Sequence, residues 1–197
     1  MTAKEMKTKV FSLIEEYYPN STLLAEDEDV IYKINGVINQ IQMELMQYRK
    51  INALSEIEIA ETDDREINLK NYIDDLYQIN NIKFDKDIEY DMPNSETIVL
   101  PDDYSGTFKV YYYKYPELMK LTFADDTASA NYDKTYEFEL DNDLLEIAPY
   151  GIAADLLKMD MISNYGRYFY ERYNEMKNTL VAYGQKPSIQ IAGGYEI

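Results

Sequence analysis

The sequence contains no cysteine, no histidine and no tryptophan. Without cysteine and histidine the chain has no disulfide, no thiol nucleophile, no Ser-His-Asp triad, no common zinc site and no imidazole acid–base group. Most classes of enzyme thereby lose their usual catalytic groups, and we expect no enzymatic activity, no metal and no cofactor. The absence of cysteine fits a reducing cytosol as well as a particle that survives outside a cell, so it does not indicate a compartment.

Long apolar runs are missing too. No stretch of about 18 consecutive apolar residues occurs, and residues 1–7 lack the apolar segment of a secretion signal. We therefore expect a soluble protein that spans no membrane and stays where it is made.

Acidic residues are in large excess, with 37 Asp and Glu against 19 Lys and Arg and a net charge of −18. Such a field repels phosphates and disfavours binding to DNA or RNA. The chain also has 21 tyrosines. Tyrosine offers apolar area and a hydroxyl and is enriched at protein–protein contacts, so we expect some tyrosines in the core and the surplus at interfaces.

Two amphipathic helices are predicted at the N-terminal end. A capping-box pattern begins at Thr2, and apolar residues at helical spacing predict a helix over residues 3–18. A longer apolar stripe predicts a helix over residues 24–49, with acidic residues in its first turns and Arg49 and Lys50 at its end, the order that the helix dipole favours. The stripe consists of Val30, Ile31, Ile34, Val37, Ile38, Ile41, Leu45 and Tyr48.

Two further helices are predicted near the other end of the chain. Pro149 suits the first turn of a helix, and the apolar spacing after it predicts a helix over residues 149–162. A second stripe predicts a helix over residues 165–183, ended by Gly184. Poor helix formers around Gly166 predict a break between the two.

Between these helix pairs, alternating and β-branched residues predict short strands. The run at 107–115, bounded by Gly and Pro, has the strongest strand signal. Residues 71–80 fit a helical turn or the start of a strand equally well. The other expected extended pieces are 57–59, 67–69, a hairpin of 82–84 with 88–90 around 85–87, then 97–100, 120–122 and 135–140.

These elements predict an α+β fold, in which helices from both ends of the chain form one bundle and an antiparallel β-region is inserted between them. The chain of 197 residues is long enough to bury a core. We divide it into N-terminal helices (1–54), a β-rich insertion (55–141), C-terminal helices (142–184) and an extended docking tail (185–197).

Adjacent acidic residues recur between the predicted elements. A pair of carboxylates can serve glycoside hydrolysis or bind a hard cation. Asp also favours turns and caps, which is the interpretation we prefer because each pair lies between elements and matches no calcium-loop pattern. The acidic groups are Asp63-Asp64, Asp74-Asp75, Asp102-Asp103, Asp125-Asp126 and Asp141-Asn142-Asp143.

Two segments are candidates for docking a partner protein. On the last helix, Tyr and Arg are frequent hot-spot residues, so Arg167, Tyr168, Tyr170 and Arg172 form a candidate anchor cluster. The alternative places Tyr165, Phe169 and Tyr173 in the core and leaves the rest in water. The alternating tail could add a strand to a neighbouring sheet, or be a disordered end, and we favour docking through its apolar residues. These residues are Ile189, Ile191, Tyr195 and Ile197.

The order of parts resembles the head–tail connector (adaptor) proteins of tailed bacteriophages. The resemblance covers roughly residues 24–183 and depends on pattern and order: two N-terminal helices, a β-insertion with the segments 98–104 and 110–116, then residues 140–149 and a helix that carries 152–157. No single motif is diagnostic. This chain has a longer β-region than the most compact connectors.

The resemblance implies a structural virion protein at the head–tail junction. Such proteins form a ring of about a dozen copies, a closed heterologous assembly, that sits under the portal protein and offers a surface to the next tail or neck protein. DNA passes through the lumen during genome ejection without specific binding, and a terminal segment often grips the portal. A lumen lined with carboxylates would repel DNA, which suits the acidic composition.

Two other functions remain open. An acidic protein could mimic DNA and inhibit a nucleic-acid enzyme, which predicts rows of carboxylates on one face. A glycosidase with a carboxylate pair would need two acids facing one cleft, and the missing tryptophan makes sugar stacking less favourable.

Overall fold

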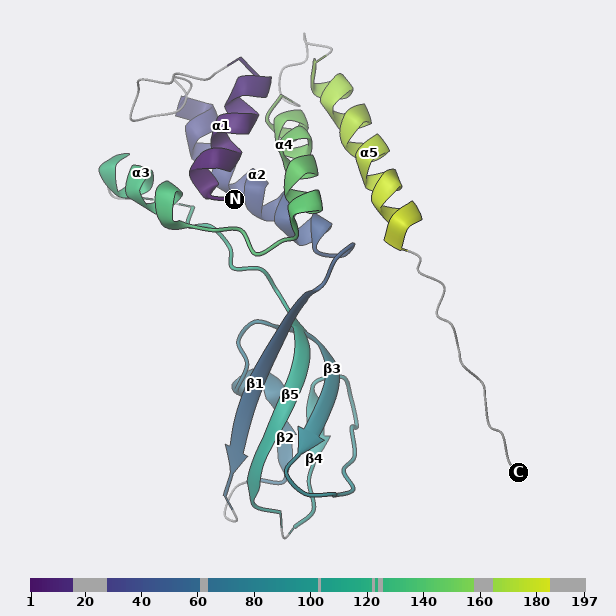
Figure 1. The fold of residues 1–197 in the computed structure, drawn as a ribbon. Helices are drawn as coiled ribbons and strands as arrows, with labels where there is room; N and C mark the ends of the chain where they lie inside the picture. The colour runs from purple at the N-terminus through teal and green to yellow at the C-terminus, as the bar shows by residue number, and fades with distance from the viewer. Residues whose placement is uncertain are drawn as a thin grey trace, which may run out of the picture.

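The structure is a computed structural model that describes residues 1–15, 28–60, 64–102, 104–121, 123, 126–157 and 165–184. The chain forms a mixed α+β fold with a helical body and a β-lobe joined by a narrow neck (Figure 1). The helical body consists of the N- and C-terminal helices packed together, with residues 116–140 lying on them. The β-lobe comprises residues 51–114. This confirms the predicted α+β fold.

The body is built around α4 (Asn142–Leu157), which contacts α1 (Ala3–Leu13), α2 (Glu28–Leu45) and α5 (Tyr165–Gly184). Its core contains large apolar side chains from all of these helices, and burying each contributes about 1.5–3 kcal/mol. Among the helices that the structure describes, none is long and apolar enough to cross a membrane. The core includes Met6, Phe11, Ile34, Ile38, Leu45, Leu144, Leu145, Ile152 and Tyr173.

Local sequence signals set the ends of the helices only in part. The capping box is present, since the Glu5 amide donates to Thr2 Oγ1 (3.2 Å) and the Thr2 amide to Glu5 Oε2 (2.8 Å). The structure describes neither residues 16–18 nor residues 24–27 of the predicted helices. The expectation that Pro149 begins a helix is wrong, because α4 starts seven residues earlier, at Asn142, and Pro149 lies in its interior.

The cost of that proline is offset by burial. An interior proline removes a helical hydrogen bond and costs about 3 kcal/mol. The turn before it carries Leu144, Leu145, Ile147 and Ala148, all of which lie in the core. Two amides of the first turn, those of Leu144 and Leu145, donate to the carbonyl of Asp141 (3.0 and 3.1 Å), which starts the helix.

The β-lobe is a small two-layer structure. One layer is an antiparallel sheet in the order β1–β5–β3, formed by β1 (Ile51–Ile59), β5 (Gly106–Lys114) and β3 (Leu76–Phe84). The second layer pairs β2 (Glu66–Asn68) with β4 (Thr97–Val99), and a short 3-10 helix, Leu69–Asn71, follows β2. A separate apolar core, which includes Ile57, Ile67, Ile98, Phe108 and Val110, lies between the layers.

The predicted hairpin around residues 85–87 is wrong. β3 ends at Phe84, its partner is β5, and residues 88–90 form no strand. The turn packs on the start of β5 instead, where the hydroxyl of Tyr104 donates to Asp85 Oδ1 (3.1 Å). Gly106 permits this close approach for two reasons. Its φ is 148°, which favours glycine, and a Cβ there would lie 2.8 Å from Asp85 Oδ2.

Residues 116–140, which we expected in the β-region, pack on the helical body. They include α3 (Asp126–Thr135), a helix that the sequence analysis missed. The alternation at 135–140 is real, since Tyr136, Phe138 and Leu140 are buried while Glu137 and Glu139 are exposed. The partner, however, is the start of the chain, through an isolated bridge between Thr2 and Glu137. Residues 120 and 121 lie outside any strand.

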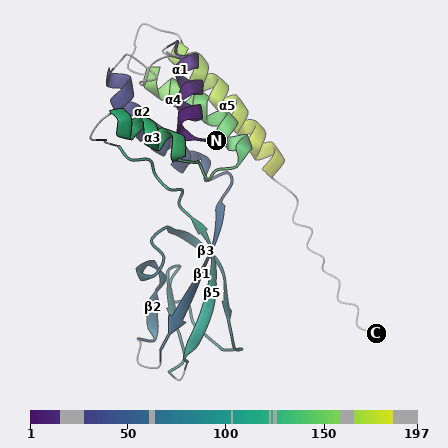
Figure 2. The same ribbon diagram turned by 60° about the vertical axis from the view of Figure 1, so that its left-hand side comes forward.

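The neck between body and lobe is polar and aromatic. Figure 2 shows that the chain crosses the neck where it enters β1 and again where it leaves β5. Tyr77 donates to Gln47 Oε1 (2.8 Å), and its ring meets that of Tyr115 edge to face at 5.1 Å. The ammonium of Lys114 pairs with Glu139. The β-lobe is therefore held to the body through specific side chains while keeping a core of its own.

Candidate interaction surfaces

The two predicted docking segments have different outcomes. All four apolar residues of the tail, Ile189, Ile191, Tyr195 and Ile197, lie outside the described part of the chain. The α5 cluster is described and is exposed, with Tyr168 at 60% and Tyr170 at 57%. Phe169 and Tyr173 are buried beneath it. Tyr165, which one interpretation placed in the core, is 67% exposed, so that part of the interpretation is wrong.

The α5 cluster does not form one surface. Because successive residues turn by about 100° around a helix, Tyr168 and Arg172 share a flank of α5 with Tyr165, whereas Tyr170 lies on the opposite flank. Arg167 points outward between them. We call Tyr165, Tyr168 and Arg172 the α5 surface. Both arginines are paired within the helix, Arg167 with Glu171 (2.9 Å) and Arg172 with Glu175 (3.2 Å).

A second apolar surface lies on α2, and the sequence analysis did not find it. It consists of Tyr32, Leu118 and Leu121, which are 75%, 50% and 61% exposed. We call these residues the α2 surface. Leu121 lies over Gly36, one turn of helix from Tyr32. No described part of the chain covers the apolar side chains of the α2 surface.

Amide side chains of α2 hold the α2 surface in place. Asn39 Nδ2 donates to the carbonyl of Met119 (2.9 Å), and the Met119 amide donates back to Asn39 Oδ1 (2.8 Å). Asn35 Nδ2 donates to the carbonyl of Lys120 (2.7 Å). These bonds fix residues 117–121 against the helix. The signal in the sequence was the helical spacing of Asn35, Asn39 and Gln42 beside the apolar stripe.

The two surfaces lie on different helices of the body. In Figures 1 and 2, α5 forms one border of the body. α4 packs against both α5 and α2, and α5 also reaches α2 directly through the ion pair of Lys177 with Glu44. Each copy of the protein therefore presents two different apolar surfaces, one on each of these helices.

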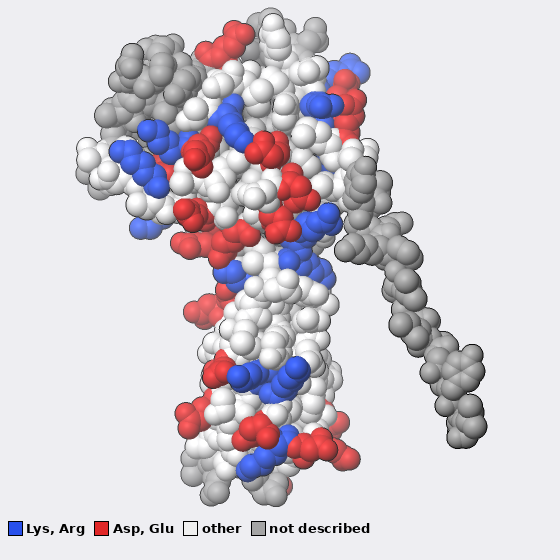
Figure 3. All heavy atoms as spheres, in the orientation of Figure 1, with Lys and Arg blue, Asp and Glu red and all other residues white. Residues whose placement is uncertain are grey.

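The predicted acidic pairs do not gather into a catalytic site among the described residues. Asp75 accepts from the hydroxyl of Tyr112 (2.9 Å), and Asp143 pairs with Arg49 (3.5 Å). Burial, with Asp75 alongside, raises the pKa of Tyr112 to about 12. No group of three or more acidic side chains that could hold a metal ion occurs in the described residues. On the face drawn in Figure 3, acidic side chains gather over the lower part of the body with basic ones at their borders, and the two kinds are mixed on the β-lobe.

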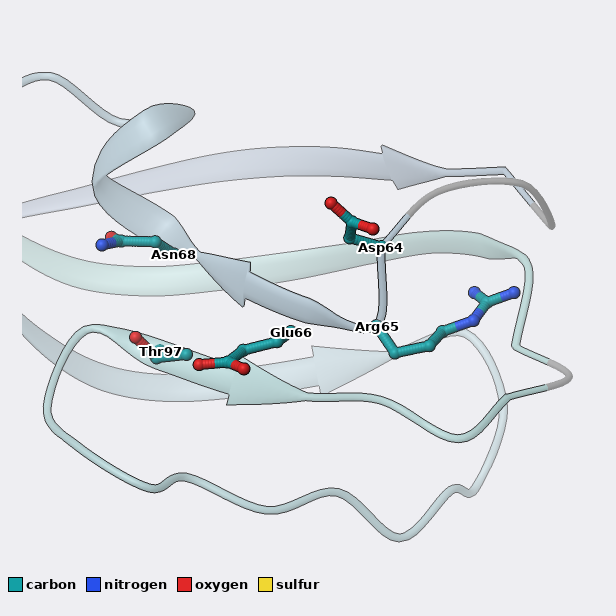
Figure 4. Close-up of a pocket in the computed structure, with 5 residues that line it drawn as sticks. All are labelled: Asp64, Arg65, Glu66, Asn68 and Thr97. Carbon is teal, nitrogen blue, oxygen red and sulfur yellow. The ribbon is translucent and has the colours of Figure 1, made fainter.

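An open hollow of about 490 Å³ lies beside β2 and β4, lined by Asp64, Arg65, Glu66, Asn68 and Thr97 (Figure 4). Its side chains do not converge. In Figure 4 the guanidinium of Arg65 points away from Asn68 and Thr97, and Arg65 Nη1 donates to the carbonyl of Tyr104 (2.7 Å). The hollow is thus a groove between loops with a structural arginine at its edge.

Comparison with known proteins gives no match: the chain fits no protein-family model, and a search of curated proteins finds no relative.

Proposed function

We propose that this chain is a structural virion protein, a subunit of a ring at the head–tail junction of a tailed bacteriophage. The ring connects the portal protein to the next tail or neck protein and extends the DNA channel. The observation that carries the proposal is the pair of unlike apolar surfaces, one on α5 and one on α2. Two unlike surfaces that meet head to tail generate a ring when the rotation between copies closes.

Other features support an assembly rather than a catalyst. Each surface has an ion pair beside it, Arg172 with Glu175 on α5 and Lys33 with Asp29 next to Tyr32 on α2, which is the composition of a contact with an apolar centre and a polar rim. The β-lobe projects from the body on its neck, in the position of a part that reaches a neighbouring protein. The net charge of −18 would let packaged DNA pass a lumen formed by such subunits without adhering.

Native mass spectrometry and negative-stain electron microscopy of the full chain, alone and with its portal protein, test the proposal. We expect rings of one copy number. A protein that remains strictly monomeric in both samples contradicts it.

Substitutions on the two surfaces sharpen the test. Tyr168→Glu and Leu121→Glu each disable one half of a head-to-tail contact, so neither variant should form rings. Loss of one tyrosine anchor costs about 2 kcal/mol, or roughly 30-fold in association. Mixing the two variants leaves one intact contact per pair and should give heterodimers but no ring. Tyr72→Glu, at a 51% exposed position of the β-lobe, is the matched control and should assemble normally.

A further inference from the structure

One edge of the strand β1 has no partner strand among the described residues. The strand pairs with β5 over nine consecutive residues, from Ile51 opposite Lys114 to Ile59 opposite Gly106, without a break in register. No described residue forms a backbone hydrogen bond with its other edge. Half of the N–H and C=O groups of β1 therefore point towards whatever lies beside the sheet.

The edge of β1 has few of the features that keep sheet edges from pairing, because its charges are confined to Glu56 and Glu58. Native proteins blunt such edges with bulges, prolines or charges. The opposite edge strand, β3, has two register shifts, between Leu76 and Gln78 and between Ile79 and Asn81. β1 has neither a bulge nor a proline, its first five residues are uncharged, and Leu54 is 52% exposed. It can accept a further strand.

We propose that residues 188–192 of one copy add a strand to the edge of β1 in the neighbouring copy. This inference rests on the proposed ring. The segment Ser188-Ile189-Gln190-Ile191-Ala192 alternates apolar and polar residues. It carries no charge, so it brings no further negative charge next to the carboxylates of Glu56 and Glu58. In an added strand, Ile189 and Ile191 point to the face on which Ile57 and Ile59 are buried.

The position of α5 favours exchange between copies. In Figure 1, α5 ends on one side of the molecule, while β1 borders the sheet on the other. The segment that follows α5 thus starts on the side where the next copy of a ring presents its β1. Pairing β1 with β1 of a second copy would instead be a twofold contact, which closes at a dimer.

Disulfide trapping with full-length protein tests this. Because the chain has no cysteine, Gln190→Cys gives a single thiol, and so does each of Asn52→Cys, Leu54→Cys, Glu56→Cys and Glu58→Cys, which are the exposed positions along β1. Gln190→Cys protein is mixed with each β1 variant, assembled and oxidised. We expect a disulfide-linked heterodimer for at least one β1 position, and none with the control Asn80→Cys on the opposite edge strand.

The outcomes separate the two proposals. If rings form without the heterodimer, the strand exchange is overturned and the ring is left intact. The same conclusion follows if the only disulfides are β1–β1 homodimers or links from Gln190→Cys to an added portal protein. Absence of rings overturns both. Ile189→Asp combined with Ile191→Asp should reduce the heterodimer more than about tenfold, because both apolar side chains lose their burial on the neighbouring sheet. Gln185→Asp, outside the added strand, should not, and an undiminished heterodimer in the double variant would contradict the inference.

Discussion

Replacing Asp133 by asparagine should destabilise the protein by about 3–5 kcal/mol, because it leaves the ammonium of Lys7 buried without a counter-charge. The pair joins α1 to α3, and Lys7 Nζ lies 2.7 Å from Asp133 Oδ2 and 2.9 Å from Oδ1. The two side chains are only 7% and 10% exposed. Water therefore cannot replace the lost carboxylate without opening the contact between the helices.

The same variant should gain stability as the pH rises. Burial lowers the pKa of Lys7 from its ordinary 10.5, and Asp133 opposes that shift. In Asp133→Asn no carboxylate opposes the effect of burial, so the pKa of Lys7 in the folded protein is lowered further. Between that lowered pKa and 10.5, the unfolded chain binds more protons than the folded one. Stability then increases with pH across that window, by at most about 1.4 kcal/mol per pH unit.

Urea unfolding at pH 7, 8 and 9, followed by circular dichroism, measures both effects. The double variant Lys7→Met with Asp133→Leu is the control, since an apolar pair of similar size is often neutral or stabilising by about 1–4 kcal/mol relative to a buried ion pair. The reasoning is refuted if Asp133→Asn costs less than about 1 kcal/mol, or if the apolar pair costs as much as the single substitution.

Three further substitutions test the packing of the body. Gly151→Ala should destabilise by about 1–3 kcal/mol, because its Cβ would lie 2.9 Å from Tyr173 Cε2 and 3.1 Å from Ile41 Cδ1; Gly36→Ala, with only Leu121 Cδ2 at 4.0 Å, should stabilise by about 0.5–1 kcal/mol. Tyr136→Phe should cost about 1–2 kcal/mol, because its buried hydroxyl donates to the carbonyl of Glu117. Chemical denaturation of each variant gives these values.

Each of these predictions has a result that would contradict it. If alanine at Gly151 and alanine at Gly36 change the free energy of unfolding equally, the close packing of α4 against α5 does not disfavour a methyl group at position 151. An unchanged stability of Tyr136→Phe, with Tyr72→Phe on the exposed surface as its control, would show that the hydroxyl contributes nothing to holding residues 117–121.

Strong periodicity made several elements predictable. The apolar stripe predicted the central part of α2, and Ile34, Ile38, Ile41 and Leu45 are all buried in the core. A long amphipathic helix is determined largely by its own residues, because one face carries nearly all of its burial. The β-branched and aromatic run of β5 was predicted for a similar reason, and β5 became the central strand of its sheet.

The candidate surfaces were predictable only in part. Tyrosine and arginine on the last helix indicated contact residues, and the structure exposes them, but it divides them between two flanks of α5. The α2 surface places Leu121 one helical turn from Tyr32, about 90 residues away along the chain, a pairing of the kind that only three-dimensional folding creates.

Local sequence determined where the chain could form a helix or an extended segment; the tertiary structure decided what each segment packs against. Pro149 lies inside α4 because burial of the preceding turn outweighs its local cost. Residues 136–140 alternate as a strand would, yet they lie on the helical body beside Thr2. Periodicity is a property of neighbouring residues, whereas the choice of partner depends on the free energy of the whole fold.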